Sequence, residues 1–129
     1  MRILISVWHP AHFHFFKNII IKLKEKGHDV FVVSRNKEQT LELISKEGIN
    51  YKVIGKHEKG NFFMKFLNMI QILKEMRHFL KETKPDIFCG INDTYSPLLS
   101  FLTRKKSVTF SDDDIWMLNS LIYIFFSSL

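Results

Sequence analysis

The chain has 129 residues, of which 46% are hydrophobic and 25% are charged, and 19 Lys and Arg against 13 Asp and Glu give it a formal net charge of +6. This length and composition fit one globular domain with one core, and they argue against two full domains and against intrinsic disorder. A single cysteine excludes a disulfide framework and is typical of a reducing compartment, so we expect a cytoplasmic protein.

The chain opens with a strand, a helix and a second strand. Residues 3–7 are almost continuously apolar, which is typical of a strand covered on both faces. The next apolar residues recur at the spacing of one buried helix face, made of Phe16, Ile19, Ile20 and Leu23. Gly27 is expected to end this helix in a left-handed conformation, and residues 30–33 form the second strand.

The same alternation continues to the end of the chain. Asn36 is expected to cap a helix that ends at Gly48, before a third strand at residues 51–54. A long helix follows, and its apolar stripe is predicted to contain Phe66, Ile70, Leu73, Met76 and Leu80. Further elements are expected at residues 86–90, 96–102 and 107–110. The pattern predicts an α/β fold, a doubly wound, Rossmann-like parallel sheet of about five strands in three α/β/α layers.

Ligands of such sheets bind beyond the carboxyl ends of the strands, near the point where the strand order reverses. This rule brings together the loops at residues 8–14, 90–94 and 111–114. The first loop reads WHPAHFH and has no glycine with which to approach a pyrophosphate, so it argues against a nucleotide cofactor. The sequence also has no Walker motif, GxSxG elbow or CxxC motif.

The first loop carries three histidines, His9, His12 and His14. Histidine can act as an acid or a base near neutral pH, and it can donate hydrogen bonds to sugar hydroxyls or phosphate. Their HxxHxH spacing fits no established metal-site pattern, so we expect no metal. The structural alternative is that His12 caps the following helix and His14 lies along its surface.

The two later loops carry carboxylates with the same ambiguity. Asp93 can act as a general base or bind a hydroxyl, or else Asn92 or Asp93 simply caps the next helix. At least one of the three aspartates from Asp112 to Asp114 is expected to stabilise a helix N-terminus. The 13 phenylalanines recur mainly at helical spacing, so most are expected in the core, which argues against nucleic acid as a partner.

Three segments, at residues 1–35, 40–57 and 84–99, carry a family resemblance. With the signature HPAHFHFFK followed by KGHDV, they resemble the N-terminal half of a prokaryotic family of uncharacterised proteins related to GT-B glycosyltransferases and to UDP-N-acetylglucosamine 2-epimerase. The resemblance implies that His9, Pro10 and His12 face an interdomain cleft. Asp93 and Thr94 resemble a catalytic acidic loop of the epimerases, although the insertion of residues 91–92 loosens the correspondence.

The resemblance also implies what accompanies this half. The segment FSDDD, which contains Asp112, is similar to an F-D-T-E type segment of the family. In GT-B proteins a C-terminal domain binds most of the nucleotide sugar, and the chain is too short to include it. We therefore expect a truncated product, a natural half with a separate donor-binding subunit, or a stand-alone domain. The apolar tail at residues 112–129 favours the first two, because it would pack on the missing domain.

Two functional hypotheses follow. In the first, the chain is the acceptor-side half of a glycosyltransferase or sugar-nucleotide epimerase in polysaccharide biosynthesis, inactive alone. His12 and Asp93 are then the catalytic candidates, and the residues expected to bind the acceptor or sugar nucleotide are His9, Pro10, His14, Thr94 and Asp112. In the second, the chain is a non-catalytic binding module for a donor-binding subunit. In either case its basic residues are compatible with peripheral contact to an anionic membrane.

Overall fold

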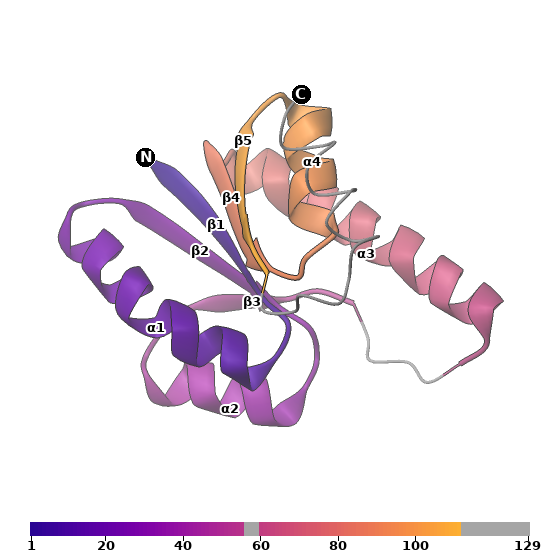
Figure 1. Ribbon diagram of the computed structural model, residues 1–129, viewed down its shortest axis with the longest axis horizontal. Helices are drawn as coiled ribbons and strands as arrows, with labels where there is room; N and C mark the ends of the chain where they lie inside the picture. Colours follow the sequence, from indigo (N-terminus) through magenta and orange to yellow (C-terminus); the bar gives the residue numbers. More distant parts are fainter. Residues whose placement is uncertain (56–59, 112–129) are drawn as a thin grey trace.

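The computed structural model describes residues 1–55 and 60–111. The acidic run from Asp112 and the apolar tail at 112–129 lie outside the described residues. Strands and helices alternate strictly along the described chain (Figure 1). The elements are β1 (Arg2–Val7), α1 (Pro10–Glu25), β2 (Asp29–Ser34), α2 (Glu38–Lys46), β3 (Tyr51–Val53), α3 (Phe62–Thr83), β4 (Ile87–Ile91), α4 (Tyr95–Thr103) and β5 (Lys106–Phe110).

The five strands form one sheet in the order β3-β2-β1-β4-β5, and every neighbouring pair is parallel. The chain moves outward from β1 to β3 and then returns past β1 to form β4. The strand order therefore reverses between β1 and β4, where Ser6 lies opposite Gly90 in the register. In a doubly wound sheet, this reversal is where the loops at the carboxyl ends separate and leave room for a ligand.

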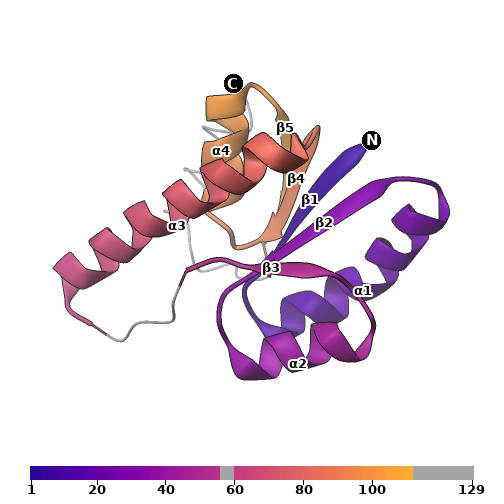
Figure 2. The same ribbon diagram turned by 180° about the vertical axis from the view of Figure 1, so that it is seen from behind.

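Two helices cover each face of the sheet. Figures 1 and 2 show α1 and α2 on one face and α3 and α4 on the other. Side chains of β1 alternate between two cores, because successive residues of a strand point to opposite faces. Ile5 packs with Phe16 in the core under α1 and α2, whereas Leu4 packs with Met76 in the core under α3 and α4. The predicted three-layer α/β fold is confirmed, and the continuous apolar run of β1 is explained.

The buried helix faces differ in detail from the predicted ones. In α1 the buried residues are Phe13, Phe16 and Ile20, whereas Ile19 is 37% exposed, so its predicted burial is wrong. In α3 the buried residues are Ile72, Met76, Leu80 and Thr83. Phe66 was predicted in this stripe but is exposed, because the first turns of α3 extend away from the sheet (Figures 1 and 2).

Two other expectations are wrong. Most of the phenylalanines in the described residues are not in the core; the exposed ones are Phe15, Phe62, Phe63, Phe66, Phe101 and Phe110. At α2 the N-cap residue is Lys37 rather than Asn36, and the Lys37 side chain makes no capping hydrogen bond. Gly27 adopts the predicted left-handed backbone angles after α1, and Gly48 does the same where α2 ends.

Over residues 1–55 and 60–111, no helix has the length and hydropathy needed to cross a bilayer.

Candidate functional site

The loop between β1 and α1 places three of the predicted site residues. His9 is the N-cap of α1, with an extended backbone, and its Nδ1 accepts a hydrogen bond from the backbone N–H of Ala11 at 3.2 Å. Pro10 follows at the first helical position, where its missing N–H costs nothing. Because Nδ1 of His9 is an acceptor, the neutral ring carries its proton on Nε2, which can then donate to a ligand.

His12 lies one turn into α1, beside His9. Its backbone N–H donates to the His9 carbonyl at 3.0 Å, and the two imidazole rings lie 6.0 Å apart between centroids. The alternative in which His12 caps the helix is therefore wrong, because His9 does so. His14 is exposed on the surface of α1, with its ring beside that of Phe13 at 6.2 Å. The first loop thus brings together His9 and His12, and leaves His14 outside this pair.

Asp93 lies between β4 and α4 and is only 1% exposed. Its carboxylate accepts hydrogen bonds from the backbone N–H groups of Tyr95 at 2.9 Å and Ser96 at 3.3 Å, and from the Ser96 hydroxyl. These contacts satisfy the free N–H groups at the start of α4, so the Asp93 side chain caps this helix. Thr94 is exposed and makes no side-chain capping bond. A catalytic role for Asp93 stays a prediction.

A buried polar network extends from Asp93 to the central strand. The Ser6 and Ser96 hydroxyl oxygens lie 3.1 Å apart, and both residues are fully buried or nearly so. Since Ser96 gives its single proton to Asp93, Ser6 must donate to Ser96. Gly90 borders this network: a Cβ added there would lie 2.8 Å from Cβ and 2.9 Å from Oδ2 of Asp93. Glycine at position 90 is thus what allows the carboxylate to sit against β4.

The sequence prediction missed a second group at the same edge of the sheet. Trp8 directly follows β1 and Arg35 directly follows β2. The guanidinium carbon of Arg35 lies 5.2 Å from the Trp8 ring centroid and 5.7 Å from that of Tyr95, and its Nη2 donates to the Tyr95 hydroxyl at 3.3 Å. Trp8 and Tyr95 also meet edge to face at 5.9 Å. Their position in the sequence could have indicated this group, because both Trp8 and Arg35 immediately follow a strand.

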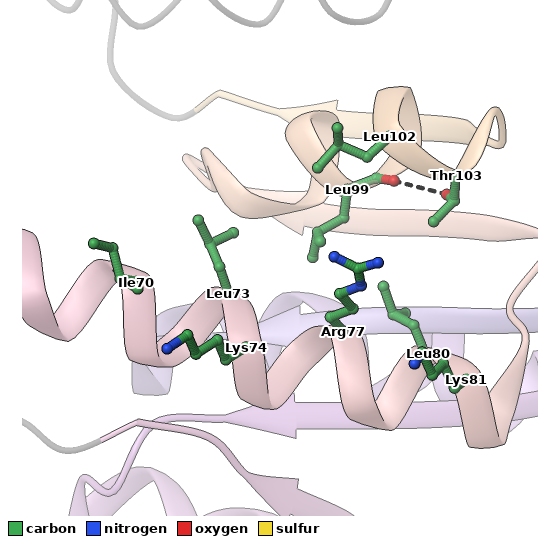
Figure 3. A pocket seen from close by; sticks show the side chains of 9 residues that line it. All are labelled: Ile70, Leu73, Lys74, Arg77, Leu80, Lys81, Leu99, Leu102 and Thr103. Atoms are coloured by element: carbon green, nitrogen blue, oxygen red, sulfur yellow. Dashed lines mark hydrogen bonds between the residues drawn. The ribbon is translucent and has the colours of Figure 1, made fainter.

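Of two hollows in the described surface, one lies away from this edge of the sheet and the other lies at it. A groove of about 510 Å³ runs between α3 and α4 (Figure 3). It is lined by Ile70, Leu73, Lys74, Arg77, Leu80, Lys81, Leu99, Leu102 and Thr103. Most of these residues belong to the C-terminal turns of both helices, away from the loops that carry His9 and Asp93. The second hollow, of about 450 Å³, lies at the candidate site, between His9, Pro10 and residues 36–40.

The described part of the chain offers neither a reactive thiol nor a metal-binding cluster. Burial raises the pKa of the Cys89 thiol to about 11, so the thiol stays protonated near neutral pH and is a poor nucleophile. Residues 1–55 and 60–111 contain no cluster of three or more His, Cys, Asp or Glu side chains placed to hold a metal ion. The expectation that the protein uses neither metal nor cofactor stays a prediction.

A comparison with protein families identifies the chain. The model of the family described as "Protein of unknown function (DUF354)" matches residues 1–114. The chain belongs to this family. No curated protein matches it by sequence. The resemblance to an uncharacterised family is confirmed, and DUF354 is that family.

Several glycosyltransferases of known structure share this fold. MurG of Acinetobacter baumannii superposes with a TM-score of 0.77 at 12% identity, over 94% of this chain and 38% of MurG. The rhamnosyltransferase SpnG gives 0.75 at 15% identity, over 95% of this chain and 38% of SpnG. SsfS6 of Streptomyces sp. SF2575, complexed with thymidine diphosphate, gives 0.67 at 16% identity, over 86% and 38%. The fold is that of a GT-B N-terminal half, and the chain spans less than two fifths of each of these proteins.

Replacement of Gly90 by alanine tests the buried network. The new methyl group would displace the Asp93 carboxylate, so we expect Gly90→Ala to lower the free energy of unfolding by about 1–3 kcal/mol, measured by equilibrium urea denaturation. The matched control is the same substitution in an Asp93→Gly background, which removes both the Cβ and the carboxylate that the methyl group would meet, so the cost should fall by at least about half. Equal costs in the two backgrounds would show that Gly90 and Asp93 are not coupled.

Proposed function

We propose that the chain is the acceptor-side half of a GT-B-type glycosyltransferase, or of a related sugar-nucleotide epimerase, and that a donor-binding domain or subunit completes its active site. The observation that carries the proposal is the His9–His12 pair, with ring centroids 6.0 Å apart, at the reversal point of a GT-B-like sheet. Loops at such a point are where α/β proteins bind ligands. Solved glycosyltransferases with this fold support the reaction class.

The residues at the edge have distinct roles in this proposal. In sugar transfer, an acceptor hydroxyl loses its proton to a base and attacks the anomeric carbon, while a nucleoside diphosphate leaves. His12 is the proposed base, and His9, with Nε2 free of the capping bond, orients a hydroxyl. Pro10, His14 and Thr94 remain proposed substrate contacts. The bonds that the Asp93 carboxylate makes to Tyr95 and Ser96 favour a positioning role for it over direct proton transfer.

The donor is proposed to be a nucleotide sugar bound chiefly by the other half. SsfS6 and SpnG were each solved with thymidine diphosphate, which supports a nucleoside diphosphate as the leaving group. Stabilising the charge on a departing diphosphate needs donors aimed at it, and we place these in the donor-binding half. The isolated chain is therefore proposed to be inactive.

Histidine variants test this assignment in the enzyme completed by its donor-binding half. We expect His12→Ala to lower kcat by about 10²–10⁴-fold, the range for loss of a general base, as measured by release of nucleoside diphosphate. The matched control is His28→Ala, because His28 precedes β2 at the opposite edge of the sheet and should leave kcat unchanged. The isolated 129-residue chain should release no diphosphate.

The alternative proposal is a binding module that supplies only an interface to a donor-binding subunit. Full activity of the completed enzyme with both His9→Ala and His12→Ala would favour this module over a catalytic half. Turnover of a nucleotide sugar by the isolated chain would contradict both proposals, because each assigns the donor site to another domain or subunit.

A specific surface favours peripheral membrane contact as an additional property. The first two turns of α3 expose large apolar side chains, with Phe62 86% and Phe63 64% exposed. Further along the same helix, Lys74, Arg77 and Lys81 line the groove shown in Figure 3. Exposed aromatic side chains and cations on the same helix suit an anionic bilayer surface, where each basic residue contributes about 1 kcal/mol of attraction.

Vesicle sedimentation tests this contact. We expect the chain to sediment with vesicles that contain phosphatidylserine, and binding to weaken as salt rises, because the attraction is electrostatic. Replacing Phe62 and Phe63 by serine should lower binding by at least about tenfold, since both rings would insert into the interface. Ile21→Ser removes an exposed apolar residue from α1 and should have no effect. Equal binding to neutral vesicles, or none to either, would contradict the proposal.

A further inference from the structure

We propose that Arg35 is the binding residue for an oxyanion at the carboxyl edge of the sheet, and that the acceptor of this protein carries a carboxylate or phosphate group. The inference rests on the proposed function only where it identifies the oxyanion as part of the acceptor. The anion site itself is argued from the contacts of Arg35, Trp8 and Tyr95.

The guanidinium of Arg35 is held between two aromatic rings. Its carbon lies 5.2 Å from the Trp8 ring centroid and 5.7 Å from the Tyr95 ring centroid, and Nη2 donates to the Tyr95 hydroxyl at 3.3 Å. Among the described residues, no carboxylate forms an ion pair with Arg35. Neutral groups thus orient the guanidinium, and its full charge stays available for a ligand.

Two buried donors in this group have no hydrogen-bond partner among residues 1–55 and 60–111. The indole Nε1 of Trp8, a residue only 9% exposed, is one, and Nε of Arg35 is the other. Both are N–H groups that can only donate, so the partner they need is an acceptor. Buried polar groups in folded proteins are nearly always paired, and two unpaired donors in contacting side chains point to one shared acceptor.

The positive charge of Arg35 narrows the class of chemical group that can accept these hydrogen bonds. A neutral sugar hydroxyl would satisfy one donor but would leave the guanidinium charge unmatched. An oxygen of a carboxylate or phosphate satisfies the donors and the charge together, and the planar fork of arginine fits both groups. The position also fits the acceptor substrate of the proposed reaction, because Trp8 directly precedes His9 at the strand reversal. An anionic acceptor bound here would approach the proposed histidine base from the β2 side.

The test is an NMR titration of the 129-residue chain, following the Trp8 indole and Arg35 side-chain N–H resonances. Sodium phosphate and sodium acetate are added in separate arms, with sodium chloride holding the ionic strength constant. Trp8→Phe assigns the indole signal, since the chain has two tryptophans. We expect a saturable shift of both resonances in at least one arm. Saturation with phosphate alone identifies a phosphate ligand, and with acetate alone a carboxylate.

Three variants connect the binding to Arg35. Arg35→Gln should weaken binding by at least tenfold, and Arg77→Gln, which removes the same charge from α3, should leave it unchanged. Arg35→Lys guards against misfolding, because it keeps the positive charge and a long aliphatic side chain; it should bind at least fivefold more weakly, since Nε and the planar fork are lost. No saturable shift in either arm, or unchanged binding in Arg35→Lys, would overturn the inference.

This outcome is separable from that of the proposed function. Anion binding is measured without turnover, so a completed enzyme that transfers no sugar while phosphate still binds at Arg35 would refute the function and keep the site. An active enzyme whose isolated half shows no anion binding would refute the site and keep the function.

Discussion

The arrangement of the candidate site depends on one buried carboxylate. Asp93 is almost inaccessible, and a buried charge is costly unless several hydrogen bonds compensate it. The first N–H groups of α4 and the Ser96 hydroxyl supply those bonds, and Ser6 extends them to the central strand. Gly90 leaves the space in which the carboxylate lies. Together they fix where α4 begins relative to β1 and β4, at the point where the strand order reverses.

The two functional groups of the edge are positioned from this fixed point. Tyr95 is the first residue of α4 and holds Arg35 by a hydrogen bond and by its ring. Trp8 leads directly from β1 into His9, whose imidazole caps α1 and so has a defined orientation. A cation and two histidines therefore lie at neighbouring strand ends. In our proposal, this edge holds an anionic ligand and acts on its hydroxyl, and a second domain or subunit brings the reaction partner.

The sequence was sufficient for the fold and for only part of the site. Residues 3–7 and the repeated helix endings at Gly27 and Gly48 depend on local patterns, and these predict a parallel α/β sheet. Helix faces depend on which side meets the sheet, so Phe13 was missed where Ile19 was expected. The role of Arg35 depends on β2 lying beside β1 and on α4 returning over both, which no spacing within the sequence records.

The most direct test of this account is amide hydrogen exchange at Tyr95 and Ser96, because both N–H groups donate to the Asp93 carboxylate. If that carboxylate fixes the edge, both amides exchange at least about 100-fold more slowly than in an unstructured chain, and Asp93→Ala removes most of this protection. If both amides exchange at the rate of an unstructured chain, the start of α4 is not held by Asp93 and the site lacks its fixed point.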